Sequence, residues 1–150
     1  YINGVWYLVS YKGEVQPIDV TAQRPAVAER WWLASEMDRA ANWRPAGWHG
    51  KAGNATDGNT KLWVAMTPDG YDGSHKDPAT EVWLMDVERR SMLKRISLEV
   101  PALSIDVNRA NDVLVVNIDG NLDVYNGLTG EYRHNIRALG DTPYMVHAVE

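Results

Sequence analysis

One polar stretch in the middle of the chain concentrates the side chains that could do chemistry. Residues 69–77 read Asp-Gly-Tyr-Asp-Gly-Ser-His-Lys-Asp and combine three carboxylates with an imidazole. Carboxylate oxygens and imidazole nitrogens are common metal ligands, so a cation site is one interpretation. The stretch lacks the acidic residue that closes an EF-hand loop, and residues 68–70, Pro-Asp-Gly, are an ordinary turn signal. We therefore predict a polar loop without a metal.

The histidines, serines and cysteines give no catalytic pattern. Histidines at positions 49, 75, 134 and 147 are widely spaced, and no pair has the His-Glu-x-x-His spacing of a zinc site. No serine has the glycines of a nucleophile elbow, and there is no glycine-rich phosphate loop. The absence of Cys excludes disulfides, thiolate metal sites and c-type haem attachment within this chain. We predict no catalytic, cofactor-binding or metal-ligating residue here.

Composition and charge exclude further classes. The chain has 150 residues, of which 45% are hydrophobic and 23% charged, as in one soluble domain. Its net charge of -5 argues against binding nucleic acid through phosphates. No apolar run reaches the roughly 18 residues of a membrane span. The chain begins at Tyr1, directly before strand-like sequence, which we interpret as a processed or partial chain.

An internal repeat indicates the elements that hold the polar loop. Residues 82–96 align with residues 122–136, and both read as strand, polar turn and strand. Asp86 aligns with Asn126 at the turn, where a short acceptor side chain can hold its own backbone. We therefore predict two copies of one hairpin.

The apolar runs before these hairpins align as well. Residues 62–66 match residues 113–117, and the longer connection in the first copy fits an enlarged loop at 69–79. Residues 5–9 look like an earlier copy. These runs are continuously apolar rather than alternating, which in antiparallel strands indicates that both faces of the sheet are covered. Stacked propeller blades have this property.

The sequence thus predicts an all-β fold, a β-propeller treated as a single partial domain over residues 1–150. Three four-stranded blades are expected near residues 5–33, 46–98 and 103–138, with a closing strand at 144–149 and a helical turn at 35–41. A two-sheet sandwich is the alternative, but it does not explain the repeat. Because closed propellers have about four to eight blades, we expect this chain to be part of a larger ring or to need another chain.

The tryptophans allow two interpretations. Trp43 and Trp48 flank residues 44–47 and could anchor a partner, since Trp is favoured at interfaces. Packing between blades is the interpretation that we favour for both. Trp63 and Trp83 lie inside strand runs and are expected in the core.

Several motifs in order resemble one enzyme family. They are Asn-Trp-Arg-Pro-Ala-Gly at 42–47, Met-Thr-Pro-Asp-Gly at 66–70, His-Lys-Asp-Pro-Ala at 75–79, Glu-Val-Trp-Leu-Met-Asp at 81–86 and Leu-Ser-Ile-Asp at 103–106. This set resembles the heavy subunit of the tryptophan tryptophylquinone amine dehydrogenases. The 42–47 and 75–81 stretches are nearer to the aromatic amine dehydrogenase than to the methylamine enzyme.

The resemblance implies both a fold and a function. The family's heavy subunit is a seven-bladed propeller, and this chain looks like its three C-terminal blades. The family's N-terminal half supplies a Phe to the substrate channel, a role that does not carry over because this chain has no Phe. The quinone cofactor belongs to a small light subunit. The implied complex is periplasmic, oxidises primary amines to aldehydes and ammonia, and passes electrons to a cupredoxin or a cytochrome.

This interpretation makes the chain a scaffold subunit that is inactive alone. His75, Lys76 and Trp43 are the candidate residues of a subunit interface, His75 and Lys76 because long loops on rigid scaffolds tend to carry function and Trp43 because Trp is a favoured interface anchor. The alternative function is a non-catalytic propeller module that binds a protein partner.

Overall fold

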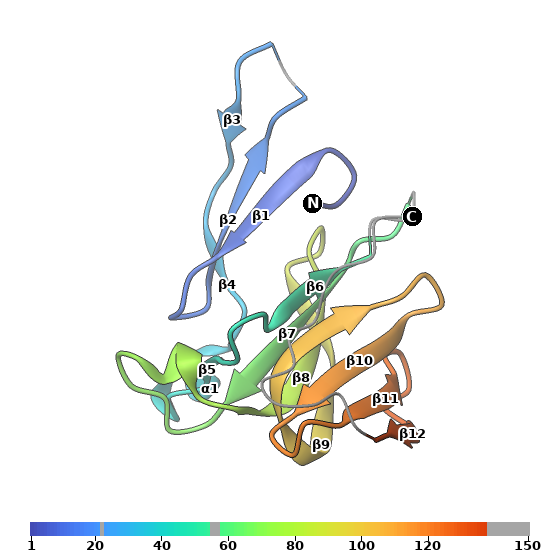
Figure 1. Cartoon of the computed structure of the whole chain (residues 1–150). Coiled ribbons are helices and arrows are strands. Elements are labelled where there is room, and N and C mark those ends of the chain that lie inside the picture. Colours follow the sequence, from blue (N-terminus) through green and yellow to red (C-terminus); the bar gives the residue numbers. More distant parts are fainter. Residues whose placement is uncertain (22, 55–57, 138–150) are drawn as a thin grey trace.

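The computed structural model describes residues 1–21, 23–54 and 58–137, which form two antiparallel β-sheets (Figure 1). The strands of the first sheet are β1 (Val5–Val9), β2 (Glu14–Asp19), β3 (Ala26–Val27) and β4 (Trp31–Trp32). Those of the second are β5 (Arg44–Pro45), β6 (Lys51–Gly53), β7 (Lys61–Thr67), β8 (Ala79–Asp86), β9 (Ser91–Val107), β10 (Asp112–Asn117), β11 (Leu122–Asn126) and β12 (Tyr132–Ile136). A short helix, α1 (Glu36–Ala40), and a 3₁₀ turn, η1 (Ser74–Lys76), are the helical elements of the described residues.

The second sheet consists of two four-stranded units that share β9. Residues 91–97 of β9 pair with β8 and residues 102–107 pair with β10, with Ala102 also opposite Ala79 of β8. Pro101 lies between these two halves, where a residue without an N–H disturbs the ladder least. The middle unit is therefore β5 and β6 beside β7, then β8 and the first half of β9. The last unit is the second half of β9, then β10, β11 and β12. An outer strand that continues as the next innermost strand is the connection expected of propeller blades.

The predicted repeat is confirmed down to its turns. The Oδ1 atom of Asp86 accepts hydrogen bonds from the backbone N–H groups of Glu88 and Arg89 at 3.1 and 3.0 Å. Asn126 Oδ1 does the same for the two backbone N–H groups of residues 128 and 129, at 2.9 and 3.0 Å. Two different side chains thus close the same turn because each offers one short acceptor.

The first unit departs from the predicted arrangement. Its four strands occupy only three positions, since β3 and β4 both pair with β2 on the side opposite β1. Among the described residues, β1 pairs with β2 alone, and an isolated bridge joins Ile2 to Val5 at its start. The four-stranded unit predicted near residues 5–33 is therefore present, but its two short strands β3 and β4 share one position beside β2.

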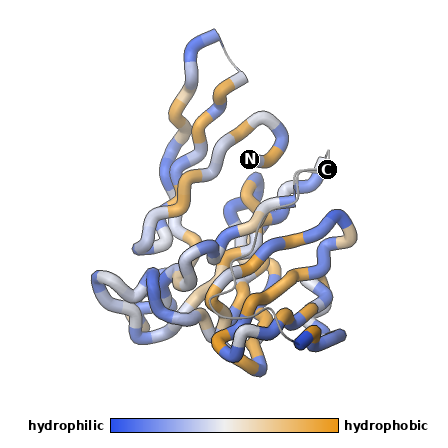
Figure 2. The backbone as a smooth tube through the Cα atoms, in the orientation of Figure 1, coloured by the Kyte–Doolittle hydropathy of each residue, from blue (hydrophilic) through white to orange (hydrophobic). Residues whose placement is uncertain are grey.

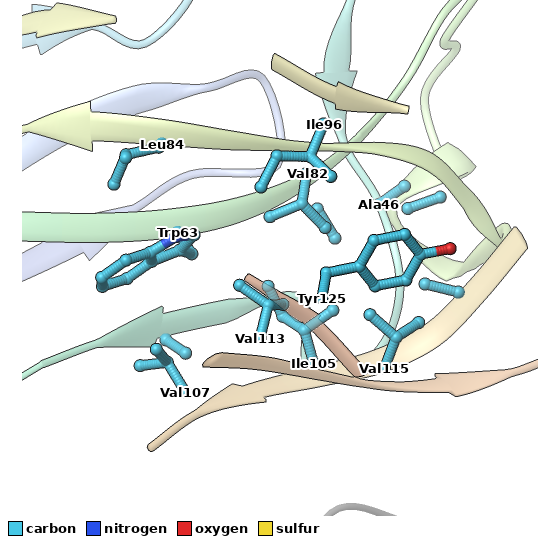
Figure 3. Close-up of a cluster of buried hydrophobic side chains, with 14 residues drawn as sticks. Ala46, Trp63, Val82, Leu84, Ile96, Ile105, Val107, Val113, Val115 and Tyr125 are labelled. Carbon is cyan, nitrogen blue, oxygen red and sulfur yellow. The ribbon is translucent and has the colours of Figure 1, made fainter. Parts of the chain in front are cut away.

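Both faces of the middle unit are covered, as its continuous apolar runs predicted. Trp63 and Ala65 of β7 point into a cluster shared with the last unit, whereas Leu62, Val64 and Met66 point into a cluster shared with the first. Figure 3 shows the former cluster, in which Val82 and Leu84 of β8 face residues of the last unit such as Val113 and Tyr125. Hydrophobic segments lie mainly in the strands of these units, and hydrophilic segments lie mainly in the turns (Figure 2).

Local signals decide the connection between the first and middle units. Ser35 caps α1, its hydroxyl oxygen accepting from the Asp38 N–H at 3.1 Å and donating to the Asp38 carboxylate at 2.6 Å. This confirms the helical turn predicted at 35–41. No helix in the described part of the chain is long and apolar enough to cross a membrane. The predicted closing strand at 144–149 lies outside the described residues.

Candidate subunit interface

Three connections gather at one end of the units, where Figure 1 places α1, β5 and the turn after β1. They are the β1–β2 turn around Tyr11, the segment 42–48 that leads through β5, and the long connection 68–78 between β7 and β8. Each is held by contacts to the others, so that the strands position a composite surface rather than separate loops.

The long connection folds back on the segment that contains β5. The Gly70 N–H donates to the Asn42 carbonyl at 2.8 Å, and the Gly47 N–H donates to the Asp77 carbonyl at 2.9 Å. Arg44 forms an ion pair with Asp72 at 3.0 Å. The loop predicted at 69–79 is therefore present and firmly attached to its own unit, while its predicted contact with another chain stays a prediction.

His75 and Lys76 lie together on η1, as the sequence required. The Ser74 hydroxyl, buried below them, donates to the Tyr71 carbonyl at 2.9 Å and shapes the turn. The His75 ring lies 5.8 Å from the Tyr11 ring, and its Nδ1 atom is buried without a hydrogen-bond partner. The Lys76 ammonium lies 5.7 Å from the centre of the Trp48 ring. His75 thus connects the first unit to the loop, and Lys76 connects the loop to Trp48.

Trp48 contradicts the favoured sequence interpretation. Its side chain is 62% exposed rather than packed between blades. Its backbone N–H donates to the Leu103 carbonyl at 3.1 Å, and a Cβ on the neighbouring Gly47 would lie only 3.0 Å from that same oxygen. Because the backbone is pressed against β9, the large ring has no room inside and turns outward. The nearby glycines at positions 47 and 50 were the available sequence signal for this close approach.

Trp43 belongs to another cluster. It is half-buried, packs against the cluster between the first and middle units, and its ring centre lies 5.3 Å from that of Trp83. The Arg95 guanidinium lies over both rings, at 5.0 and 4.1 Å, and is paired with the Asp38 carboxylate. The main contacts of Trp43 are thus those of a packing residue that connects α1 to the middle unit. The place of Trp43 in an interface stays a proposal.

Trp83 and Trp63 are completely buried, as predicted. The Trp83 indole donates to Glu81 at 2.6 Å, and the Trp63 indole donates to the Gly127 carbonyl at 3.0 Å. Each buried indole N–H therefore has a partner, as burial of a polar group requires.

The carboxylates of the polar stretch do not converge. Asp72 is held by Arg44, while a hydrogen bond from Tyr71 to Asp77, together with the charge of Asp77, raises the pKa of the Tyr71 hydroxyl. No group of three or more His, Cys, Asp or Glu side chains able to hold a metal is found among residues 1–21, 23–54 and 58–137. What gathers here instead is a set of aromatic rings and basic groups, which favours contact with another molecule over chemistry.

Comparison with known proteins assigns the chain to a family. The family model of the methylamine dehydrogenase heavy chain matches residues 2–150. The chain belongs to this family. It is 24% identical over 140 residues to the methylamine dehydrogenase heavy chain of Paracoccus versutus, covering 91% of this chain and 32% of that protein. It is 26% identical over 148 residues to the heavy chain of Methylobacillus flagellatus, covering 95% and 36%. The chain therefore spans about a third of the length of these relatives.

Solved structures show the same fold class. The chain superposes on Saccharomyces cerevisiae Sqt1 with a TM-score of 0.58 at 14% identity, covering 89% of this chain and 30% of that one. It matches the C-terminal WD40 domain of Sif2 with a TM-score of 0.55 at 6% identity, over 89% and 33%. A europium-containing methanol dehydrogenase matches with 0.52 at 13% identity, over 89% and 23%. At these identities the likeness concerns the fold alone, and it supports the propeller prediction.

Proposed function

We propose that this chain is part of the scaffold of a periplasmic quinoprotein amine dehydrogenase. The observation that carries the proposal is its membership of the methylamine dehydrogenase heavy chain family over residues 2–150. The chain would hold a light subunit that carries tryptophan tryptophylquinone. The complex would oxidise a primary amine to an aldehyde and ammonia and pass the electrons to a cupredoxin or a cytochrome.

The chemistry itself requires a group that no ordinary side chain provides. Amine oxidation of this type starts at an electrophilic carbonyl, which a quinone supplies when bound. No residue of this chain is proposed to hold the quinone, so the contribution of the chain is placement. A scaffold must fix a reacting group within fractions of an ångström, and two clusters packed against one middle unit provide such rigidity.

The candidate contacts to the light subunit are His75, Lys76 and Trp43. His75 and Lys76 stand on a loop that is bonded to β5 and its neighbours rather than free in solution. A preorganised loop loses little conformational entropy on binding, which favours its use as a docking element. Trp43 would act from its stack with Arg95 and Trp83.

Which amine is oxidised is also part of the proposal. The stretches at 42–47 and 75–81 favour an aromatic amine over methylamine by resemblance. The remaining propeller blades would come from further sequence or from another chain, because closed rings have about four to eight blades.

Purification with its natural partners tests the proposal. We expect a small, Cys-rich subunit with a visible quinone absorbance to copurify, and we expect amine-dependent reduction of a dye by the complex. The chain alone should show neither the absorbance nor the activity. Turnover by the purified chain alone, or a mass change from cross-linked Trp within it, would contradict the scaffold role.

A non-catalytic module that binds a protein is the alternative. The exposed aromatic rings at the loop end favour it equally, because they indicate contact and not catalysis. A copurifying partner without a chromophore, and complexes without amine oxidation, would decide for this module.

A further inference from the structure

Exposed aromatic and lysine side chains form a surface at the end of the units where the three connections gather. It comprises Tyr11, Lys12, Trp48, Tyr71 and Lys76, and we refer to it as the aromatic–lysine surface. The three rings are 42, 62 and 59% exposed, respectively. Exposed Trp and Tyr side chains gathered on one end are the usual anchors of protein interfaces.

Contacts between neighbours make this surface continuous. Lys12 lies over the Tyr11 ring at 5.6 Å, the Tyr11 ring touches His75, and Lys76 lies over the Trp48 ring. Tyr71 belongs to the same loop as His75 and Lys76 and is fixed through its contact with Asp77. The surface thus combines residues of the first and middle units.

Two lysines contribute positive charge to this surface, beside the acidic Asp72 and Asp77 of the same loop. In the part of the chain that the structure describes, neither Lys12 nor Lys76 forms an ion pair, although the chain as a whole has a net charge of -5. The nearby Asp72 is occupied by Arg44. An ammonium group over a ring in water gains only about 0.5–1 kcal/mol and keeps its donors free. Both lysines therefore remain available to carboxylates of another molecule.

We infer that the aromatic–lysine surface binds an acidic face of the light subunit, with Trp48 entering an apolar pocket and with Lys12 and Lys76 pairing with carboxylates around it. This inference rests on the proposed function and adds the chemistry of the partner surface. An apolar anchor surrounded by charges is the usual anatomy of a protein interface. An anionic lipid surface is disfavoured, because a chain with a net charge of -5 is repelled by it.

Lysine acetylation in the natural complex tests the placement. Acetylation rates of Lys12 and Lys76 are measured by mass spectrometry in the chain alone and in the complex with its copurified light subunit. We expect both to be protected at least about fivefold in the complex. Lys94, which lies on the outer strand β9, is the internal control and should react equally in both. Unchanged rates at Lys12 and Lys76 within an intact, active complex would overturn this inference and leave the proposed function standing.

Binding of matched variants tests the chemistry. Trp48→Ala should weaken binding of the separated light subunit about 30-fold, the effect of a typical interface anchor, and Trp48→Phe should recover most of it. The double variant Lys12→Gln/Lys76→Gln should weaken binding about tenfold at low salt, and the difference should shrink at high salt. Lys94→Gln and Trp6→Ala, matched in residue type, should leave the affinity unchanged.

Other outcomes assign the surface differently. If no quinone-carrying subunit copurifies, both the proposed function and this inference fail. Self-association of the chain that Trp48→Ala abolishes would give the surface to a second copy. Binding to phosphatidylserine vesicles that the double lysine variant abolishes would give it to a membrane. Either result would overturn the inference.

Discussion

Strands β1 and β7 are alike in sequence and opposite in environment. Both are apolar and contain a Trp, Val-Trp-Tyr-Leu-Val in β1 and Leu-Trp-Val-Ala-Met within β7. In β7 these five residues are all buried, whereas in β1 Trp6 and Leu8 are 49 and 52% exposed. An apolar strand sequence therefore indicates that the strand can be buried on both faces. The units packed beside it decide whether both faces are in fact buried.

The neighbours differ in a simple way. The middle unit lies between the first and last units, so alternate side chains of β7 enter separate clusters. Only one face of β1 meets the middle unit, through Tyr7 and Val9. Because side chains alternate across a strand, the residues between them point to the other face.

Removing a tryptophan from each region gives the largest expected contrast. Trp83→Ala should lower the free energy of unfolding by about 3–5 kcal/mol, because it leaves a large cavity and removes both the indole donor to Glu81 and one of the two rings under Arg95. Trp6→Ala should cost less than about 1 kcal/mol, since its ring is half exposed. Urea unfolding measures both, and nearly equal losses would contradict the comparison.

Introducing a hydroxyl into each strand should give the same contrast between β7 and β1 with a smaller loss of stability. Val64→Thr in β7 buries a polar group in an apolar cluster, which we expect to cost about 1–3 kcal/mol. The matched change Leu8→Thr on the exposed face of β1 should stay within about 0.5 kcal/mol. The same denaturant titration checks both, and a large loss at Leu8 would show that its face is covered in solution.

The repeated turns provide a third contrast, between the middle and last units. Asp86→Ala removes the acceptor of two backbone hydrogen bonds and should cost about 1–2 kcal/mol. Asp86→Asn should cost less than about 1 kcal/mol, because Asn126 closes the equivalent turn with an amide oxygen. Equal losses for the two variants would show that the charge, and not the acceptor, holds the turn.

The smallest effect that we predict is a difference in pH dependence between the wild-type protein and Asp86→Asn. Burial raises the pKa of Asp86, but hydrogen bonds from Arg89 and Thr60 and the Arg89 charge outweigh it and leave the pKa below its ordinary value. A carboxyl whose pKa is lower in the folded than in the unfolded state stabilises the fold at pH values above its unfolded-state pKa of about 4. This stabilisation is lost as the pH falls through the folded-state pKa. Below about pH 4, wild-type stability should therefore fall more steeply than that of Asp86→Asn. Parallel curves in acid urea titrations would contradict this.

Much of the fold followed from local pattern. The offset repeat predicted β8 and β11 with the same turn, the capping spacing at Ser35 predicted α1, and the uninterrupted apolar run predicted the double coverage of β7. These features depend on residues near one another in sequence or on a period that the strand itself imposes.

The candidate site was less predictable. The sequence singled out His75 and Lys76, but it placed Trp48 inside and gave no role to Tyr11. Trp48 is outside because the backbone of residues 47–48 is pressed against β9, and Tyr11 joins the surface because the first unit packs beside the middle one. Neither contact leaves a trace in the local pattern.

The sequence by itself thus determined the strands, their turns and the repeating unit, since propensity and side-chain alternation act over a few residues. Only the tertiary structure decided which apolar face is covered and which tryptophan is exposed. These properties depend on the packing of units whose contacting residues are tens of positions apart, and packing distances are set by the whole assembly of strands rather than by any one of them.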